Sequence, residues 1–211
     1  MNNFVEWLKN RLQQDLPGDV AQYKMAPKLR QSSSHYLQNN PNHKVGAVNV
    51  LLYAKQDKVH TVLTLRNSYN GAHSAQVSFP GGKIEANENI TDAAIRETFE
   101  EIGIEQQHMQ HIGNLSHLYI PASNFLVHPI ITVLTDIPAF KPDVREVNKI
   151  IEFPLQNLFD EAIKKETVIN TSYGLKITAP YYEIDEQVVW GATAMILSEF
   201  EQLLLPYKNN L

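Results

Sequence analysis

Residues 82–104 read GKIEANENITDAAIRETFEEIGI, and this stretch decides how the rest of the chain is interpreted. Asn89 can cap a helix, Asp92 places a negative charge in its first turn, and Gly103 can end it. We therefore predict a helix over residues 89–102. At about 100° per residue, one arc of about 140° forms its packing face, which carries Ala94, Ile95, Thr98, Phe99 and Ile102.

The other side of this helix carries Glu97, Glu100 and Glu101 at spacings that make their carboxylates converge. Like charges on adjacent turns repel each other, and Arg96 compensates only in part by reaching Glu100 at i+4. A solvated acidic helix face is the ordinary interpretation of such a pattern. The alternative is a divalent-cation site, because Mg²⁺ and Mn²⁺ take oxygen ligands and keep waters and substrate phosphates around them. The residues that flank the helix favour this second interpretation.

The whole segment resembles the Nudix box, position by position. That pattern is Gly, five residues, Glu, seven residues, Arg-Glu, an apolar residue, any residue, Glu-Glu, any residue, Gly and an apolar residue. The matching residues are Gly82, Glu88, Arg96, Glu97, Glu100, Glu101, Gly103 and Ile104. Thr98 stands where the pattern prefers an aliphatic residue, although it still lies on the packing face. The resemblance implies an α/β fold, specifically a Nudix-type α/β/α sandwich with a mixed β-sheet.

The same resemblance assigns roles to individual residues. Metal binding falls to Glu97, Glu100, Glu101 and the backbone of Gly82. Glu88 and Arg96 correspond to positions that buttress the loop and orient a metal-binding carboxylate. The implied cofactor is Mg²⁺ or Mn²⁺, which would polarise a phosphoryl oxygen and lower the pKa of the attacking water. Glu146 is the candidate general base because it carries an expected Glu-Val pattern before a strand, and an exposed loop carboxylate is the alternative interpretation of it.

Residues 62–82 read VLTLRNSYNGAHSAQVSFPGG and resemble the additional signature of the coenzyme A pyrophosphatase branch of this family. The matched positions predict substrate contacts by Arg66, His73, Gln76 and Phe79, although Phe79 also suits the core. Gly71 stands where the signature usually has a second basic residue, and Ala75 replaces a glycine. Further segments that resemble this branch lie at residues 24–27, 119–125, 146–155 and 190–194.

The resemblance implies a diphosphatase that hydrolyses a nucleoside diphosphate linked to another group. Coenzyme A or its derivatives are the favoured substrates, and the products would be 4′-phosphopantetheine and adenosine 3′,5′-bisphosphate. One alternative is ADP-ribose or another nucleotide sugar. The other is a non-catalytic Nudix module that senses nucleotides, but such modules commonly lose metal ligands, and here all three glutamates are present.

The 211 residues suffice for a single domain. We expect an N-terminal helix at residues 3–15, a wrapping loop to residue 43, and a core over residues 44–204. The pattern of apolar residues predicts strands near 45–53, 59–65, 76–79, 112–120, 126–135, 149–153, 167–173 and 180–184. It also predicts helices near 155–164 and 192–204.

Composition excludes several classes of protein. There is no cysteine, which rules out disulfide scaffolds, thiolate metal sites and cysteine nucleophiles. The net charge of −5 gives no support to nucleic-acid binding. No apolar run reaches the length of a membrane span, and the N-terminus lacks a secretory core, so we expect a cytoplasmic protein that binds no membrane. Homodimers are frequent in the family, and the N-terminal helix is a candidate contact.

Overall fold

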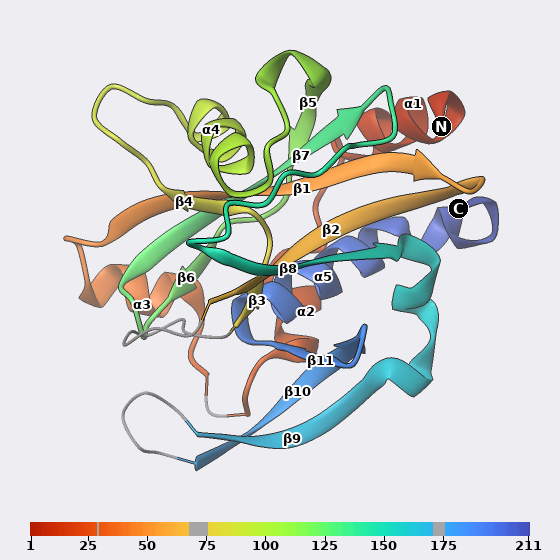
Figure 1. The fold of residues 1–211 in the computed structure, drawn as a ribbon. Coiled ribbons are helices and arrows are strands. Elements are labelled where there is room, and N and C mark those ends of the chain that lie inside the picture. Colours follow the sequence, from red (N-terminus) through yellow and green to blue (C-terminus); the bar gives the residue numbers. More distant parts are fainter. Residues whose placement is uncertain (29, 68–75, 171–175) are drawn as a thin grey trace.

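The computed structural model describes residues 1–28, 30–67, 76–170 and 176–211, and these form an α/β fold with two sheets (Figure 1). The larger sheet consists of β1 (Lys44–Lys55), β2 (Lys58–Arg66), β3 (Val77–Ser78), β4 (Gly81–Lys83), β5 (Met109–Asn114), β6 (Leu118–Ile120), β7 (Phe125–Leu134) and β8 (Val147–Pro154). The smaller sheet consists of β9 (Lys164–Asn170), β10 (Lys176–Ile184) and β11 (Gln187–Trp190).

The helices of the described residues lie mainly on the two faces of the larger sheet. The α-helices are α1 (Asn2–Arg11), α2 (Gly18–Gln22), α3 (Ser33–Asn39), α4 (Ile90–Ile102) and α5 (Gly191–Leu204). Short 3₁₀ helices are η1 (Tyr23–Met25), η2 (Gln106–His108), η3 (Leu155–Phe159), η4 (Glu161–Ile163) and η5 (Leu205–Asn210). No helix within these ranges is both long and apolar enough to cross a membrane.

The larger sheet is mixed, as expected. Its central part runs β3-β2-β1-β7-β5, in which β1 and β7 are parallel while β1 and β2 form an antiparallel hairpin. Gln56 and Asp57 both have positive φ at the hairpin turn, which matches the right-handed twist of the two strands. Additional pairings attach β4 to β1, β6 to β7, and β8 to β2. The β4 pairing matters most for function, because β4 leads into the Nudix-like segment.

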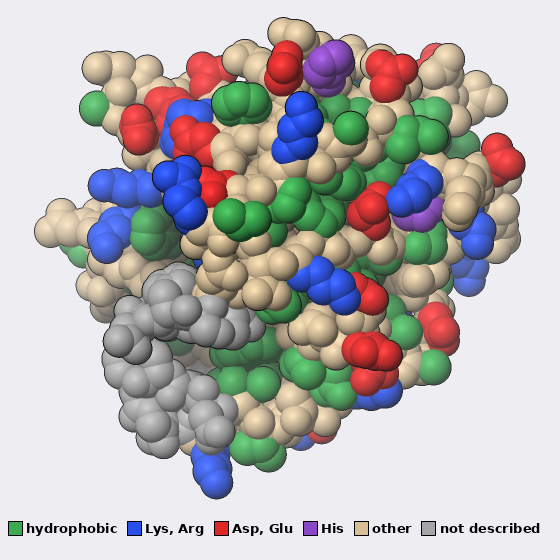
Figure 2. All heavy atoms as spheres, in the orientation of Figure 1, with side chains coloured by type: hydrophobic (Ala, Val, Ile, Leu, Met, Phe, Trp, Pro, Cys, Tyr) green, Lys and Arg blue, Asp and Glu red, His purple; other side chains and the backbone are tan. Residues whose placement is uncertain are grey.

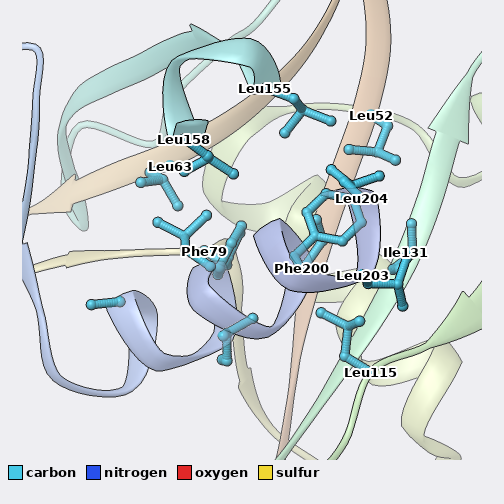
Figure 3. Close-up of a cluster of buried hydrophobic side chains, with 14 of the residues drawn as sticks. Leu52, Leu63, Phe79, Leu115, Ile131, Leu155, Leu158, Phe200, Leu203 and Leu204 are labelled. Atoms are coloured by element: carbon cyan, nitrogen blue, oxygen red, sulfur yellow. The ribbon is translucent and has the colours of Figure 1, made fainter. Parts of the chain in front are cut away.

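Strand β1 has buried side chains on both faces, and this produces two cores. Val50 and Leu52 pack toward α5 together with Phe79 and Phe200 (Figure 3). Leu51 and its neighbours on the opposite face pack against α4. The sheet therefore lies between helices on both sides, which confirms the predicted α/β/α arrangement.

Several predicted elements were wrong in extent or type. The first helix ends at Arg11, and the region interpreted as a long loop contains α2 and α3. Ser32 caps α3 by accepting a hydrogen bond from the His35 backbone N–H. The strand predicted at 112–120 is two strands, β5 and β6, and the predicted helix at 155–164 is two 3₁₀ turns. Strand β11 was not predicted, because its residues continue directly into α5 without a break signal.

The N-terminal segment is fixed to α5 by a buried carboxylate. Glu199 is fully buried and accepts hydrogen bonds from the backbone N–H groups of Gly18 and Ser116 and from the side chain of Gln22. The apolar side of α1 is also covered within the chain, because Phe4 is buried and lies 5.6 Å from Tyr207, measured between ring centroids. That side of α1 is therefore not available to a second copy of the chain.

Helix α4 is attached to the sheet by a buried polar network. Thr98, the departure from the Nudix pattern, accepts a hydrogen bond from Asn49 at 3.0 Å, and Asn49 in turn accepts one from Thr132 at 2.8 Å. All three residues are fully buried. The Asn49 backbone N–H also donates to the Pro80 carbonyl, so the same residue ties the turn before β4 to β1. Phe99 was expected on the packing face but is 52% exposed, whereas Ala93, which was not expected there, is fully buried.

Candidate active site

The site is built around the glycine turn that precedes α4. Strand β4 pairs with β1 so that Gly81 lies opposite Val48 and Gly82 opposite Ala47. Gly81 has φ of +155°, and a Cβ added there would overlap the Ala47 carbonyl oxygen. A Cβ added at Gly82 would overlap the carboxylate of Glu97. Glycine is therefore required at Gly81, where the overlap is with backbone, and glycine at position 82 lets the Glu97 carboxylate rest directly against the backbone of β4.

Arg96 organises the first group of carboxylates. Its Nε lies 2.8 Å from Glu88 Oε1 and its Nη2 lies 3.1 Å from Glu88 Oε2, so that Glu88 holds the guanidinium with both oxygens. Its Nη1 lies 2.9 Å from Glu97 Oε1 and 3.2 Å from Glu100 Oε2. Arg96 thereby connects the loop before α4 with the acidic face of the helix, as the family resemblance implied. We call Glu88, Arg96 and Glu97 the box cluster.

Arg66 organises a second group that comes from three separate parts of the chain. Its Nη1 lies 3.0 Å from Glu101 Oε1, and its Nη2 lies 3.7 Å from Glu146 Oε2. The Glu101 side chain is only 2% exposed, whereas the Glu146 side chain is 56% exposed. We call Arg66, Glu101 and Glu146 the cross-strand cluster, because β2, α4 and the loop before β8 each contribute one member.

The loop that carries Glu146 is held against β2 by hydrogen bonds that sequence reasoning missed. The Asn67 backbone N–H donates to the Glu146 carbonyl at 2.9 Å, and the Asn67 side chain donates to the Val144 carbonyl at 2.8 Å. Asp143 donates its backbone N–H to the Glu101 carbonyl at 3.0 Å. No local pattern announces these contacts, since each joins residues that are far apart in the sequence.

Burial and charge change the acidity of these carboxyl groups in opposite directions. Burial raises the pKa of Glu101 to about 7, against the effect of Arg66, and the charges of Glu97 and Glu146 add to the increase. The backbone N–H of Gly81 favours the charged form more weakly. Burial also raises the pKa of Glu97. By contrast, the hydrogen bonds from Arg96 lower the pKa of Glu88.

The arrangement of the carboxylates can be tested for its fit to a divalent cation. Within the ranges that the structure describes, no group of three or more acidic, histidine or cysteine side chains is close enough to form a ready-made metal site. Arginines hold one oxygen of Glu97 and one of Glu101. However, Glu101 Oε2 is buried and has no hydrogen-bond partner among the described residues, and the backbone of Gly82 lies beside Glu97. A buried, unpartnered carboxylate oxygen in an acidic site fits a cation ligand.

The remaining predicted residues are placed as follows. Glu100 is 54% exposed and lies at the outer side of α4, where it contacts Arg96. Gln76 is half-buried and its carbonyl accepts a hydrogen bond from the Arg66 backbone N–H at 3.0 Å. The Phe79 side chain is 1% exposed and belongs to the core on the α5 side, away from the carboxylates. His73 lies outside the described residues.

Charged side chains of both signs are intermingled on the face that includes α4. Figure 2 shows acidic and basic groups side by side at the upper left, over α4 and the adjoining chain. The charge of Glu146 acts on both Glu97 and Glu101, so the two clusters lie close to each other.

Comparison with known proteins agrees with this geometry. Residues 43–168 match the family model for the NUDIX domain. "Nudix hydrolase 3" of Caenorhabditis elegans is 30% identical over 171 residues, which cover 71% of this chain and 70% of that protein. The "Mitochondrial coenzyme A diphosphatase NUDT8" of Homo sapiens is 32% identical over 147 residues, which cover 68% of this chain but only 62% of that protein.

A solved structure supports the fold independently of sequence. The MutT protein from Methanosarcina mazei Go1 superimposes with a TM-score of 0.50 over 75% of this chain and 92% of its own, at 13% identity. Since the family model spans more than half of the chain and includes the glycine turn, α4 and both arginine clusters, the chain belongs to the Nudix family.

Proposed function

We propose that this chain is a Mg²⁺- or Mn²⁺-dependent diphosphatase that hydrolyses coenzyme A or its derivatives to 4′-phosphopantetheine and adenosine 3′,5′-bisphosphate. The observation that carries the proposal is a pair of glutamates, the partly buried Glu97 and the buried Glu101, each held at one oxygen by an arginine beside the glycine turn. Similarity to the human coenzyme A diphosphatase supports the choice of substrate, as does the segment before the glycine turn.

The residues that would hold the cation are Glu97, Glu101, Glu100 and the backbone of Gly82. When bound, the cation would polarise a phosphoryl oxygen and lower the pKa of the attacking water. Arg96 and Glu88 fix the orientation of Glu97, so that little reorganisation is needed when a ligand arrives. The more exposed Glu100 is suited to the outer edge of the cation site.

Glu146 is the proposed proton acceptor for the attacking water. Its carboxylate is exposed to solvent, and its charge contributes to the raised pKa values of Glu97 and Glu101, which means that it faces the same site. A general base must reach the water while remaining close to the carboxylates that position the substrate. Glu146 meets both requirements because the Asn67 hydrogen bonds fix its loop.

Coenzyme A carries a 3′-phosphate and a long pantetheine arm that ADP-ribose lacks. An enzyme selective for coenzyme A should use binding energy from these remote parts, so substrates that lack them lose rate as well as affinity. Gln76 and His73 belong to the segment proposed to contact the substrate. Gly71 replaces the second basic residue of the branch signature, so we expect a moderate preference for coenzyme A rather than an absolute one.

The test is a substrate panel with Mg²⁺ and with Mn²⁺, in which products are identified by mass spectrometry. We expect kcat/KM for coenzyme A to exceed that for ADP-ribose by at least about tenfold, a difference of roughly 1.4 kcal/mol. Equal values for the two would move the assignment to a general nucleotide diphosphatase. No turnover of any diphosphate, together with tight nucleotide binding, would favour a sensing module instead.

A further inference from the structure

Arg66 was expected to contact a substrate phosphate, but in the structure its guanidinium lies between two carboxylates. It is 3.0 Å from Glu101 and 3.7 Å from Glu146, and its own side chain is 24% exposed. In the described part of the chain, Arg66 is the residue that joins the buried Glu101 to the solvent-facing Glu146. These two carboxylates therefore fix the orientation of the Arg66 guanidinium within the protein itself.

The backbone pairing beside Arg66 places the Glu146 loop next to it. The pairing between β2 and β8 is regular until Leu65, which lies opposite Lys149, and then shifts so that Arg66 lies opposite Val147. The extra residue is therefore Asn148 of β8, and an extra residue in one strand of an antiparallel pair bends that strand, as is frequent beside active sites. The adjacent Asn67 then fixes the loop on the other side of the bulge.

Arg66 stands to Glu101 as Arg96 stands to Glu97. In each case one arginine holds Oε1 of a glutamate of α4, at 3.0 Å for the buried Glu101 and 2.9 Å for the partly buried Glu97, and a second carboxylate outside the helix holds the arginine. The second carboxylate is Glu88 in one case and Glu146 in the other. The parallel matters because Arg96 is part of the Nudix box, whereas Arg66 lies on a different strand.

We propose that Arg66 is a positioning residue of the cation site, which holds Glu101 by Oε1 and leaves the buried Oε2 for a divalent cation, while Glu146 holds the other end of the guanidinium. The inference rests on the proposed function, because it assumes that Glu101 binds the cation. According to this inference, Arg66 maintains the geometry and charge of the cation site and does not bind the 3′-phosphate of the substrate.

The experiment measures Mn²⁺ binding to the substrate-free protein by electron paramagnetic resonance of the free ion, so that turnover is not needed. The variants are Arg66→Ala, Arg66→Lys and Glu101→Gln, with Lys149→Gln as a control that removes a positive charge from the strand next to Arg66. Circular dichroism and thermal unfolding establish that each variant is folded. If Arg66→Ala does not fold, Arg66→Lys carries the comparison.

We expect Arg66→Ala to weaken Mn²⁺ binding by about tenfold or more, the usual effect of removing a group that orients a metal ligand. Arg66→Lys should weaken it by only about threefold, because lysine keeps the charge near Glu101 but cannot bridge two carboxylates. Lys149→Gln should bind as the wild type does. Glu101→Gln should show the largest loss.

Kinetics with coenzyme A and with 3′-dephospho-coenzyme A then separate positioning from phosphate recognition. A positioning role predicts that Arg66→Ala lowers kcat for both substrates by the same factor. Unchanged Mn²⁺ binding in Arg66→Ala, with a loss confined to the substrate that carries the 3′-phosphate, would overturn the inference and leave the cation site in place. Unchanged Mn²⁺ binding in Glu101→Gln would overturn both the inference and the proposed cation site.

Discussion

The box cluster and the cross-strand cluster have the same chemistry but a different origin in the sequence. In the box cluster, Glu88, Arg96 and Glu97 lie within ten positions of one another, and the distances between them are 2.8–3.1 Å. In the cross-strand cluster, Arg66 and Glu146 come from segments far from α4, and the outer contact is looser, at 3.7 Å. One group is determined by a helix and the loop before it, and the other by the way that the sheet is assembled.

This difference separates what each cluster can contribute. A cluster confined to one helix and the loop before it keeps its geometry whenever these two segments are formed, so it suits the rigid part of a site. A cluster that spans β2, α4 and a loop depends on the packing of all three, and it places an exposed carboxylate next to a buried one. Proton transfer and cation binding need such a pair, because one group must reach solvent while the other is shielded from it.

The largest expected effect comes from neutralising Glu97 of the box cluster or Glu101 of the cross-strand cluster. Glu97→Gln and Glu101→Gln keep the size of the side chain and remove its charge. We expect each to lower kcat by at least about a hundredfold, comparable to the loss of one electrostatic stabiliser of the transition state. Glu100→Gln should cost less because this side chain is half exposed and shares Arg96. Steady-state rates at saturating Mg²⁺ provide the measurement, and near wild-type rates for Glu101→Gln would contradict the assignment of the site.

Glu146→Gln and Glu88→Gln distinguish the roles of the two carboxylates that hold the arginines. If Glu146 accepts the proton, its loss should lower kcat by about tenfold to a hundredfold. Mn²⁺ binding should change little, because the contact of Glu146 with Arg66 is loose, at 3.7 Å, and Glu101 still holds the guanidinium at 3.0 Å. Glu88→Gln should act through Arg96 instead and weaken Mn²⁺ binding. A kcat for Glu146→Gln within about threefold of wild type would assign proton transfer to a carboxylate of α4 or to a metal-bound hydroxide.

The two clusters also show which contacts could be predicted from the sequence and which could not. The residues of the box cluster could be named in advance, because the resemblance to the Nudix box assigned Glu88 and Arg96 to orienting a metal-binding carboxylate and Glu97 to metal binding. The contact between Arg66 and Glu101 could not, because it joins β2 to α4 across 35 positions of the sequence. The prediction that Phe99 packs inward was wrong for a related reason: α4 is rotated so that Ala93 faces the sheet.

The contrast between local sequence patterns and contacts of distant segments also explains why only part of the fold could be predicted. The first hairpin and α5 follow from apolar periodicity, the α/β/α layers follow from the resemblance to the Nudix family, and all three are confirmed. Helices α2 and α3 were missed because they are short and polar, and they depend on contacts such as the Glu199 hydrogen bonds for their stability. The metal, the substrate and the roles of Arg66 and Glu146 stay predictions.

The clusters should also respond to pH in opposite directions in the metal-free protein. The pKa of Glu101 is raised to about 7, so the folded state holds this proton more tightly than the unfolded state does. Its contribution to stability is therefore full below about pH 4.5 and is lost as the pH rises toward 7, by at most about 3 kcal/mol. The pKa of Glu88 is lowered by Arg96, so its contribution is present above about pH 4.5 and is lost on acidification.

Urea unfolding with a chelator present, at about pH 5 and pH 7.5, measures this difference. Between pH 5 and pH 7.5, the free energy of unfolding should fall less in Glu101→Gln than in the wild type, because glutamine does not titrate. Glu88→Gln should be destabilised more at pH 5 than in a third measurement at about pH 3, because the contribution of Glu88 is lost only on acidification below about pH 4.5. Parallel changes in all three proteins would show that burial and pairing do not shift these groups as the structure indicates.

The smallest expected effect concerns the network that attaches α4 to the sheet. Thr98→Val preserves the shape of the side chain but removes the oxygen that accepts a hydrogen bond from Asn49 at 3.0 Å. A buried amide that loses a partner costs about 1–3 kcal/mol, and the Met109 sulfur at 3.5 Å is a weak substitute, so we expect a loss of about 1.5 kcal/mol in the free energy of unfolding. Thr98→Val combined with Asn49→Leu should lose less than the sum of the single losses, because the two residues interact directly.

The effect of Thr98→Val on the two clusters should be unequal. The box cluster moves with α4 and the loop before it, whereas the contact between Arg66 and Glu101 joins α4 to β2, so a loosened helix weakens the cross-strand cluster first. Mn²⁺ binding should therefore fall about twofold to threefold in Thr98→Val, and by much less when Arg66→Ala is already present, because the contact is then absent in both proteins. If Thr98→Val weakened Mn²⁺ binding equally in both backgrounds, the loss would come from the box cluster, and the two clusters would not differ in their dependence on the packing of α4.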